Sequence, residues 1–83
     1  MKEVELDGRP YIELEDVTVI HETSPGNTDE GALLCKIEDS DLGWDDDVWI
    51  PKKMIHEDSE VYKKGTEGKL IITEWIAKQK GFL

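Results

Sequence analysis

Apolar and polar residues alternate along most of the first three quarters of the chain, and a period of two is typical of a β-strand with one buried face. Residues 4–6 and 11–14 follow this pattern on either side of Asp7 and Gly8. An Asp-Gly pair supplies the positive φ angles of a tight turn, so this segment predicts a hairpin or a strand pair. Residues 17–21 are β-branched at nearly every position, which favours a further strand.

The central part of the chain predicts a second pair of strands. Residues 22–31 hold Ser, Pro, Gly and Asn and indicate a long loop, after which residues 32–38 alternate again. The positions expected to face the core are Leu33, Cys35 and Ile37. The partner strand is expected at residues 47–50, beyond an exposed hairpin tip at 39–46. Pro51 should end that strand because proline cannot donate to a ladder.

The last third predicts one more strand and a helix. A polar corner at residues 57–59 and a turn at 64–68 lead into a strand at 69–73. The helix signals are Thr73 as N-cap, Glu74 and Lys78 four residues apart, and Gly81 at the C′ position. Five or six short strands with one terminal helix predict a mainly β fold, either a small barrel or a sandwich of SH3-like or OB-like size.

Length and composition limit what this fold can be. The chain has 83 residues, which allows one hydrophobic core, so we expect a single domain over residues 1–83. No apolar run approaches the roughly 18 to 20 residues that span a bilayer, and the first residues lack the apolar stretch of a secretion signal. We therefore expect a cytoplasmic protein without membrane contact. A single cysteine, Cys35, rules out an internal disulfide and a multi-cysteine zinc site.

The charge is high and unevenly distributed. The chain carries 20 acidic and 10 basic residues, a net charge of −10. Residues 1–47 hold 15 acidic and 3 basic residues, whereas residues 48–83 hold 5 acidic and 7 basic ones. Such a surface repels a polyphosphate backbone, so a generic DNA-binding protein is not expected.

The acidic hairpin tip is the most conspicuous candidate site. The residues expected to bind a protein partner are Asp39, Asp41, Asp45, Asp46 and Asp47 as anions, with Trp44 as the apolar anchor. Calcium is not expected. If Asp39 is counted as position 1, Gly43 falls at position 5, whereas an EF-hand loop needs its glycine at position 6. A tip that only keeps the protein soluble is the structural alternative. We expect neither a metal nor a cofactor.

A second candidate surface combines cations with aromatic rings. Its residues are Trp49, Lys52, Lys53, Tyr62, Lys63 and Lys64, with Lys69 and Trp75 close in sequence. Aromatic side chains stack on bases while cations follow the backbone, so this set could form an OB-like platform for single-stranded nucleic acid. The structural alternative is that the aromatic residues fill the core and the lysines offset nearby carboxylates.

Catalytic patterns are weak. His21 with Cys35 offers two metal ligands where structural zinc needs four, and Cys35 on an apolar strand is typical of a core residue. Residues 56–60 combine a histidine, a serine and acids without a known catalytic spacing, and fit a strand end in which Asp58 or Ser59 binds following backbone amides. We therefore do not expect an enzyme.

Four short motifs in the last 40 residues suggest a family. They are Trp49-Ile50-Pro51-Lys52, Ile55-His56, Ser59-Glu60-Val61 and Glu74-Trp75-Ile76-Ala77. This pattern resembles small acidic proteins of uncharacterised function that phages and mobile elements encode. Phages commonly encode small acidic proteins that block host defence nucleases, such as CRISPR effectors, and such inhibitors look like DNA mimics. The resemblance implies an inhibitor that binds the basic nucleic-acid groove of a host enzyme, and it assigns no role to individual residues.

Overall fold

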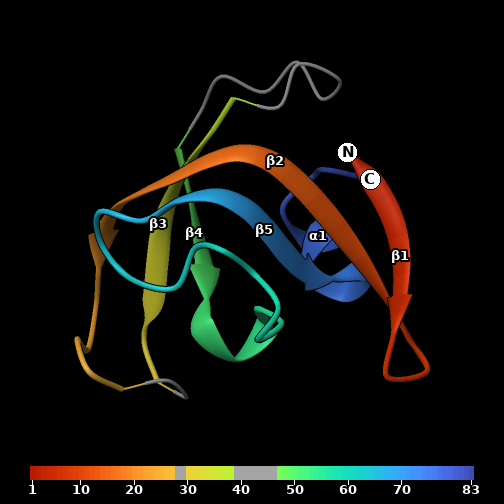
Figure 1. Cartoon of the computed structure of the whole chain (residues 1–83), viewed down its shortest axis with the longest axis horizontal. Helices are drawn as coiled ribbons and strands as arrows, with labels where there is room; N and C mark the ends of the chain where they lie inside the picture. Colours follow the sequence, from red (N-terminus) through yellow and green to blue (C-terminus); the bar gives the residue numbers. More distant parts are fainter. Residues whose placement is uncertain (28–29, 39–46) are drawn as a thin grey trace.

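The computed structural model describes residues 1–27, 30–38 and 47–83. Five strands form one antiparallel sheet, and a short helix follows the last strand (Figure 1). The elements are β1 (Lys2–Leu6), β2 (Arg9–Glu22), β3 (Ala32–Ile37), β4 (Asp47–Pro51), a 3₁₀ turn η1 (Lys52–Met54), β5 (Glu67–Thr73) and α1 (Glu74–Gln79). The prediction of a mainly β fold with a C-terminal helix is confirmed. Among the described residues the five-stranded sheet is not closed.

β2 is the strand on which the sheet is built. β1 pairs with residues 9–13 of β2, β3 pairs with residues 17–22, and β5 pairs with residues 11–18. Because β1 and β5 share partner residues on β2, they lie on its opposite edges, and the same holds for β3 and β5. β1 and β3 therefore follow one another along one edge of β2, while β5 occupies the other.

Two irregularities bend β2. The pairing register shifts between Leu14 and Val17 and again between Val19 and His21, and Asp16 has a φ of 55°. Bulges of this kind increase the bend and twist of a strand, and Figure 1 shows β2 arching over the molecule. The sequence pattern indicated two separate strands here. They form one strand because the bulge at Asp16 carries the ladder through the break in alternation.

The bulge also keeps both halves of β2 directed at the same core. Ile12 and Leu14 before it and Val17 and Val19 after it are all buried. They pack with Leu33, Cys35, Ile37, Ile50, Val61, Leu70, Ile72, Ile76, Ala77 and Phe82. The three predicted core positions on β3 are confirmed. α1 lies beneath the arch of β2 and β5 and contributes Ile76 and Ala77 to this core (Figure 1).

An irregular segment closes the outer edge of β5. The backbone N–H groups of His56 and Glu60 donate to the carbonyls of Ile71 and Lys69, both at 2.8 Å. In return, the Ser59 hydroxyl accepts from the Ile71 amide at 2.9 Å, and the Glu60 carboxylate accepts from the Lys69 amide at 2.8 Å. The side chains of Ser59 and Glu60 thus accept the hydrogen bonds that the carbonyls of a neighbouring strand would accept. The sixth strand that the sequence pattern allowed does not form among the described residues.

The C-terminal helix has the predicted termini. The Thr73 hydroxyl accepts from the Ile76 amide at 3.2 Å, and Glu74 pairs with Lys78 at 3.0 Å. Gly81 has a φ of 87°, and the Phe82 amide donates to the Ala77 carbonyl at 2.9 Å. None of the helices in the described ranges is both long and apolar enough to span a membrane.

The N-cap gives a test of the fold. We expect Thr73→Ala to lower the free energy of unfolding by about 1 kcal/mol, because the Ile76 amide loses its acceptor. Thr73→Ser keeps the hydroxyl and should stay close to the parent chain. Urea denaturation followed by circular dichroism measures both. Equal losses in the two variants would contradict a capping role for the hydroxyl.

Candidate partner-binding surface

One end of the sheet gathers carboxylates from three strands and from the residue that follows a fourth. Asp47, at the start of β4, is exposed, and it is the one predicted tip residue that the described ranges include. Asp39, Asp41, Trp44, Asp45 and Asp46 lie outside the described residues. The register aligns Asp47 with Lys36 of β3, Lys36 with Thr18 of β2, and Thr18 with Glu67 of β5. Glu67 and Asp47 therefore stand at the two ends of one row across the sheet.

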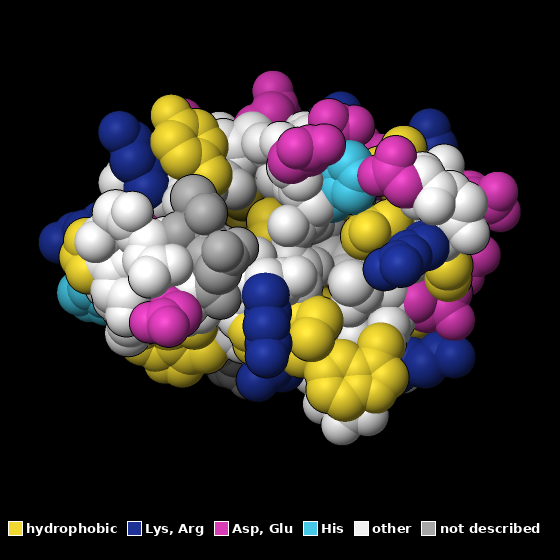
Figure 2. Space-filling view, turned by 90° about the horizontal axis from the view of Figure 1, so that it is seen from below, with side chains coloured by type: hydrophobic (Ala, Val, Ile, Leu, Met, Phe, Trp, Pro, Cys, Tyr) yellow, Lys and Arg dark blue, Asp and Glu magenta, His cyan; other side chains and the backbone are white. Residues whose placement is uncertain are grey.

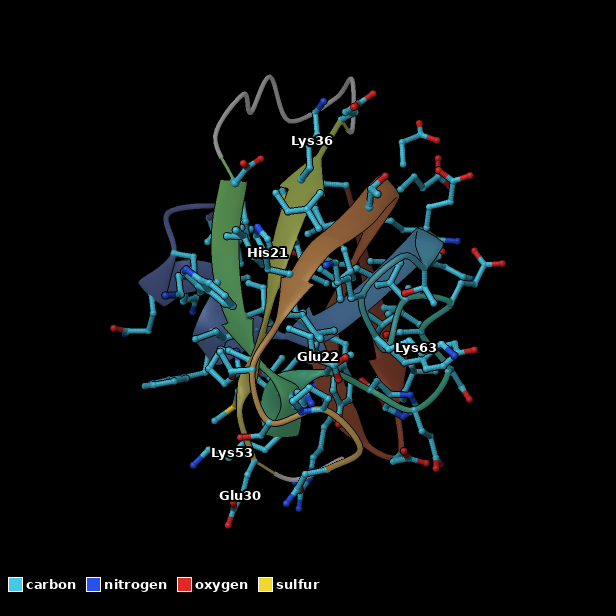
Figure 3. The ribbon with its side chains drawn as sticks, turned by 90° about the vertical axis from the view of Figure 1, so that its left-hand side faces the viewer. His21, Glu22, Glu30, Lys36, Lys53 and Lys63 are labelled. Carbon is cyan, nitrogen blue, oxygen red and sulfur yellow. The ribbon has the colours of Figure 1, made fainter. Side chains whose placement is uncertain are left out.

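Three more carboxylates lie at the same end of the sheet as this row. Glu15 and Asp16 occupy the first bulge of β2, and the Glu38 amide donates to the Asp16 carbonyl at 3.0 Å. All three side chains belong to exposed residues. We call Glu15, Asp16, Glu38, Asp47 and Glu67 the acidic end. Lys36, which Figure 3 places at this end of the molecule, pairs with Glu38 at 3.4 Å and offsets one of the five charges.

Most of the acidic end was missed by the sequence analysis. The break in alternation at residues 15–16 is the sequence signal that could have identified Glu15 and Asp16, because a bulge directs adjacent side chains outward. Glu67 could not be found in this way, since only the pairing of β5 with β2 brings it near Asp47.

Trp49 lies on the outer face of the sheet beside the acidic end. The register aligns His21, Leu34 and Trp49 in one row across β2, β3 and β4. Trp49 is 41% exposed, and Leu34 is half-buried. The labels of His21 and Lys36 in Figure 3 mark this face. Trp49 therefore lies on the same face of β4 as Asp47, two residues along the strand.

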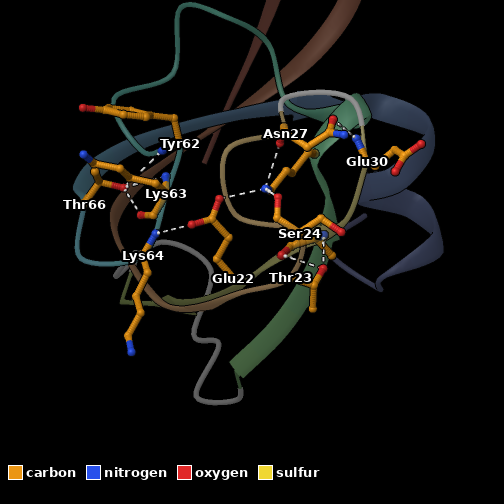
Figure 4. A network of polar contacts seen from close by, with 11 residues as sticks. Glu22, Thr23, Ser24, Asn27, Glu30, Tyr62, Lys63, Lys64 and Thr66 are labelled. Atoms are coloured by element: carbon orange, nitrogen blue, oxygen red, sulfur yellow. Dashed lines mark hydrogen bonds and ion pairs between the residues drawn. The ribbon is translucent and has the colours of Figure 1, made fainter.

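Lys52 is buried, which corrects its assignment to an exposed cationic face. Its ammonium donates to Oε2 of Glu22 at 2.7 Å and to the carbonyls of Ser24 and Asn27, both at 2.9 Å. The side chains of Lys52 and Glu22 are 5% and 11% exposed. All three ammonium protons have acceptors, so Lys52 holds residues 22–27 and is not available to a ligand. Its three partners, Glu22, Ser24 and Asn27, are labelled in Figure 4.

The second bulge of β2 explains how Glu22 reaches Lys52. The register shift after Val19 aligns Glu22 with the buried Leu33, so its side chain turns to the inner side of the sheet. The hydrogen bond from Lys52 lowers the pKa of the Glu22 carboxyl below its ordinary value, and a weaker bond from the Lys64 amide acts in the same direction. Partial burial opposes this shift by disfavouring the charged form.

The remaining cations of the predicted platform are exposed but spread out. Lys53 and Lys63 lie on either side of Glu22 in Figure 3. Lys63 Nζ stands 5.6 Å from the ring centre of Tyr62, whose residue is 63% exposed. The Thr66 hydroxyl accepts from the amides of Tyr62 and Lys63 and so fixes this turn (Figure 4). Other lysines offset carboxylates, as the structural alternative expects, including Lys69 with Glu13 at 3.5 Å.

A groove of about 740 Å³ lies between residues 22–27 and the segment at residues 55–63. Its apolar lining includes Leu33, Ile55 and Val61, and Tyr62 and Lys63 stand beside it. Figure 2 looks onto this side and shows a hollow with hydrophobic and charged side chains around it. The polar groups inside, Lys52 and Ser59, already have partners within the chain.

His56 acts as a structural clamp in this fold. Its Nε2 lies 2.9 Å from Oδ2 of Asp7, its Nδ1 accepts from the Asp58 amide at 3.0 Å, and its ring meets Tyr11 edge-on. Both ring nitrogens are engaged, which ties the β1–β2 turn to the corner at residues 57–59. The expected bond from Ser59 to a following amide is replaced by its bond to Ile71 of β5.

The two other candidate metal ligands, His21 and Cys35, do not lie together. His21 is exposed on the outer face, whereas Cys35 is buried in the core, and burial raises the pKa of the Cys35 thiol to about 12. Within residues 1–27, 30–38 and 47–83, no three His, Cys, Asp or Glu side chains are grouped to hold a metal ion. Comparison of the chain with family models, curated proteins and solved structures gives no match.

The Glu22–Lys52 pair predicts how stability depends on pH. Because the pKa of Glu22 is lowered on folding, the pair stabilises the folded state above the ordinary carboxyl pKa, and this contribution is lost as the pH falls through the lowered value. We expect Glu22→Gln to flatten the loss of stability between about pH 5 and pH 3. Urea midpoints across this range measure it. Glu3→Gln, on the exposed side of β1, is the matched control, and the same flattening in that variant would contradict the assignment.

Proposed function

We propose that this protein is a non-catalytic acidic binding protein whose partner is a protein with a basic surface. The nucleic-acid groove of a host defence nuclease, such as a CRISPR effector, is the partner surface that fits best. The observation that carries the proposal is the acidic end, where exposed carboxylates from β2, β4, β5 and the residue after β3 lie at one end of the sheet.

The chemistry of such a complex is phosphate mimicry. A nucleic-acid enzyme presents arginine and lysine side chains at sites for phosphate oxygens, and carboxylates can accept the same charge-assisted hydrogen bonds. Asp47 and Glu67 are fixed in paired strands and Asp16 in a bulge, so little backbone order has to be gained on binding. The predicted tip at residues 39–46 connects Glu38 to Asp47 and would extend the same anionic surface.

Charge attraction should make the complex sensitive to salt. Exposed carboxylates raise the rate of encounter with a basic surface, and salt screens this attraction over about 10 Å at 0.1 M. An inhibitor of this type would compete with DNA or RNA for one groove, and would leave the enzyme's catalytic residues chemically unchanged.

Charge reversal at the acidic end tests the proposal. We expect Glu38→Lys, Asp47→Lys and Glu67→Lys together to weaken retention of a basic nucleic-acid enzyme from nuclease-treated host lysate by at least about tenfold. Glu3→Lys, Glu5→Lys and Glu57→Lys change the net charge equally at other exposed positions and form the matched control. Mass spectrometry of salt-eluted fractions identifies the retained enzyme, and its activity is then assayed with each variant.

Two results would contradict the proposal. One is retention of the same proteins by the parent chain and the acidic-end variant. The other is an enzyme that binds but keeps full activity on DNA and RNA, which would argue against mimicry while leaving an acidic binding role.

Direct binding of single-stranded nucleic acid is the alternative function, and it has to be distinguished from binding of a basic protein partner. Because Lys52 is buried, the cations of such a nucleic-acid site would be Lys53, Lys63 and Lys64, with Tyr62 as the aromatic residue. Titration of a fluorescent oligonucleotide at low salt distinguishes the two functions. We expect no change in anisotropy at micromolar protein, whereas binding that Tyr62→Ala weakens would favour the alternative.

A further inference from the structure

The outer edge of β4 is open, in contrast to that of β5. The Lys52 amide donates to the Gly31 carbonyl at 3.0 Å, which sets the alternation of hydrogen-bonded pairs between β3 and β4. The backbone N–H and C=O groups of Val48 and Ile50 therefore point toward β3. Those of Asp47 and Trp49 point away from the sheet. No described residue donates to or accepts from these outward groups of Asp47 and Trp49.

We propose that the β4 edge binds an extended, arginine- or lysine-containing segment of the partner protein as an added strand. Main-chain hydrogen bonds to Asp47 and Trp49 would supply affinity, and alternate side chains of the segment would supply specificity. This inference rests on the proposed function and names the part of the partner that the surface binds.

Charge and side chains around the edge select a basic segment. Asp47 lies on the edge itself, and Glu38 follows the end of β3 next to it, so cationic side chains of an added strand meet carboxylates at this end. The exposed ring of Trp49 lies between Asp47 and the end of the strand, where an arginine side chain can stack on it. A second copy of the chain is a poorer occupant, because each copy carries a net charge of −10.

Pro51 limits the length of the added strand. Proline has no N–H to donate, and as the N-cap of η1 its carbonyl accepts the first bond of the 3₁₀ turn. The outward groups available to a partner are therefore the two donors and two acceptors of Asp47 and Trp49, enough for a short strand. The edge of β5 offers no comparable site, because residues 56–60 already occupy the outward groups of Lys69 and Ile71.

Hydrogen exchange of the full chain with two peptides tests this edge. The probe is an acetylated, amidated heptapeptide of alternating arginine and valine. Its control has the same sequence with N-methyl groups on alternate residues, which keeps the charge and blocks strand pairing. We expect the unmodified peptide to bind about tenfold more tightly than its control, a difference of about 1.4 kcal/mol, and to slow exchange of the Asp47 and Trp49 amides.

Two substitutions at one position separate the backbone donor from the charge. Asp47→Pro removes the outward N–H and the carboxylate but leaves the ladder to β3 intact, whereas Asp47→Asn removes the carboxylate alone. We expect the preference for the unmodified peptide to fall in Asp47→Pro and to persist in Asp47→Asn, both checked for folding by circular dichroism. Equal preference in both variants would contradict pairing at this donor.

The remaining outcomes are distinguishable. Equal binding of both peptides, with the Trp49 amide still exchanging freely, overturns the edge proposal and leaves the acidic binding role standing. Binding by neither peptide at low salt contradicts the proposed function, and the edge proposal with it. Protection of the Trp49 amide in the free protein that grows with protein concentration assigns the edge to a second copy, and so also overturns the proposal.

Discussion

The bend in β2 at Asp16 is the constraint on which the rest of the structure depends. A straight strand of this length would present one flat ladder, whereas the bulge turns the two halves apart and lets each pair with different partners along one edge. The residue in the bulge takes a positive φ, a conformation that Asp tolerates better than most residues. The acidic side chain and the bend are therefore properties of the same position.

The second irregularity in β2 has a separate consequence. Without the shift after Val19, Glu22 would face outward with Thr18 and its carboxylate would be one more exposed charge. Turned inward, it pairs with Lys52, which also satisfies the carbonyls of Ser24 and Asn27. Such a pair costs desolvation of both ions, so its main effect is to fix the conformation of residues 22–27.

The sequence predicted those parts of the fold that local chemistry determines. The Asp7-Gly8 turn, the alternating core residues of β3 and the Thr73 cap each depend on neighbours in the chain, and all three are confirmed. The burial of Lys52 depends on Glu22, thirty residues away, and could not be anticipated from a lysine-rich segment that resembles an exposed one. The grouping of Glu67 with Asp47 likewise follows from strand pairing alone.

The uneven distribution of charge argues for a role beyond solubility. A net charge of −10 would keep the protein soluble if it were spread evenly, and even spacing would minimise repulsion between carboxylates. The fold instead collects the residues of two bulge positions, one strand end and two strand starts at one end of the sheet. These carboxylates are exposed, so a partner can reach them. A basic partner surface would donate charge-assisted hydrogen bonds to them, and the complex would gain affinity from charges that add no burial to the free protein.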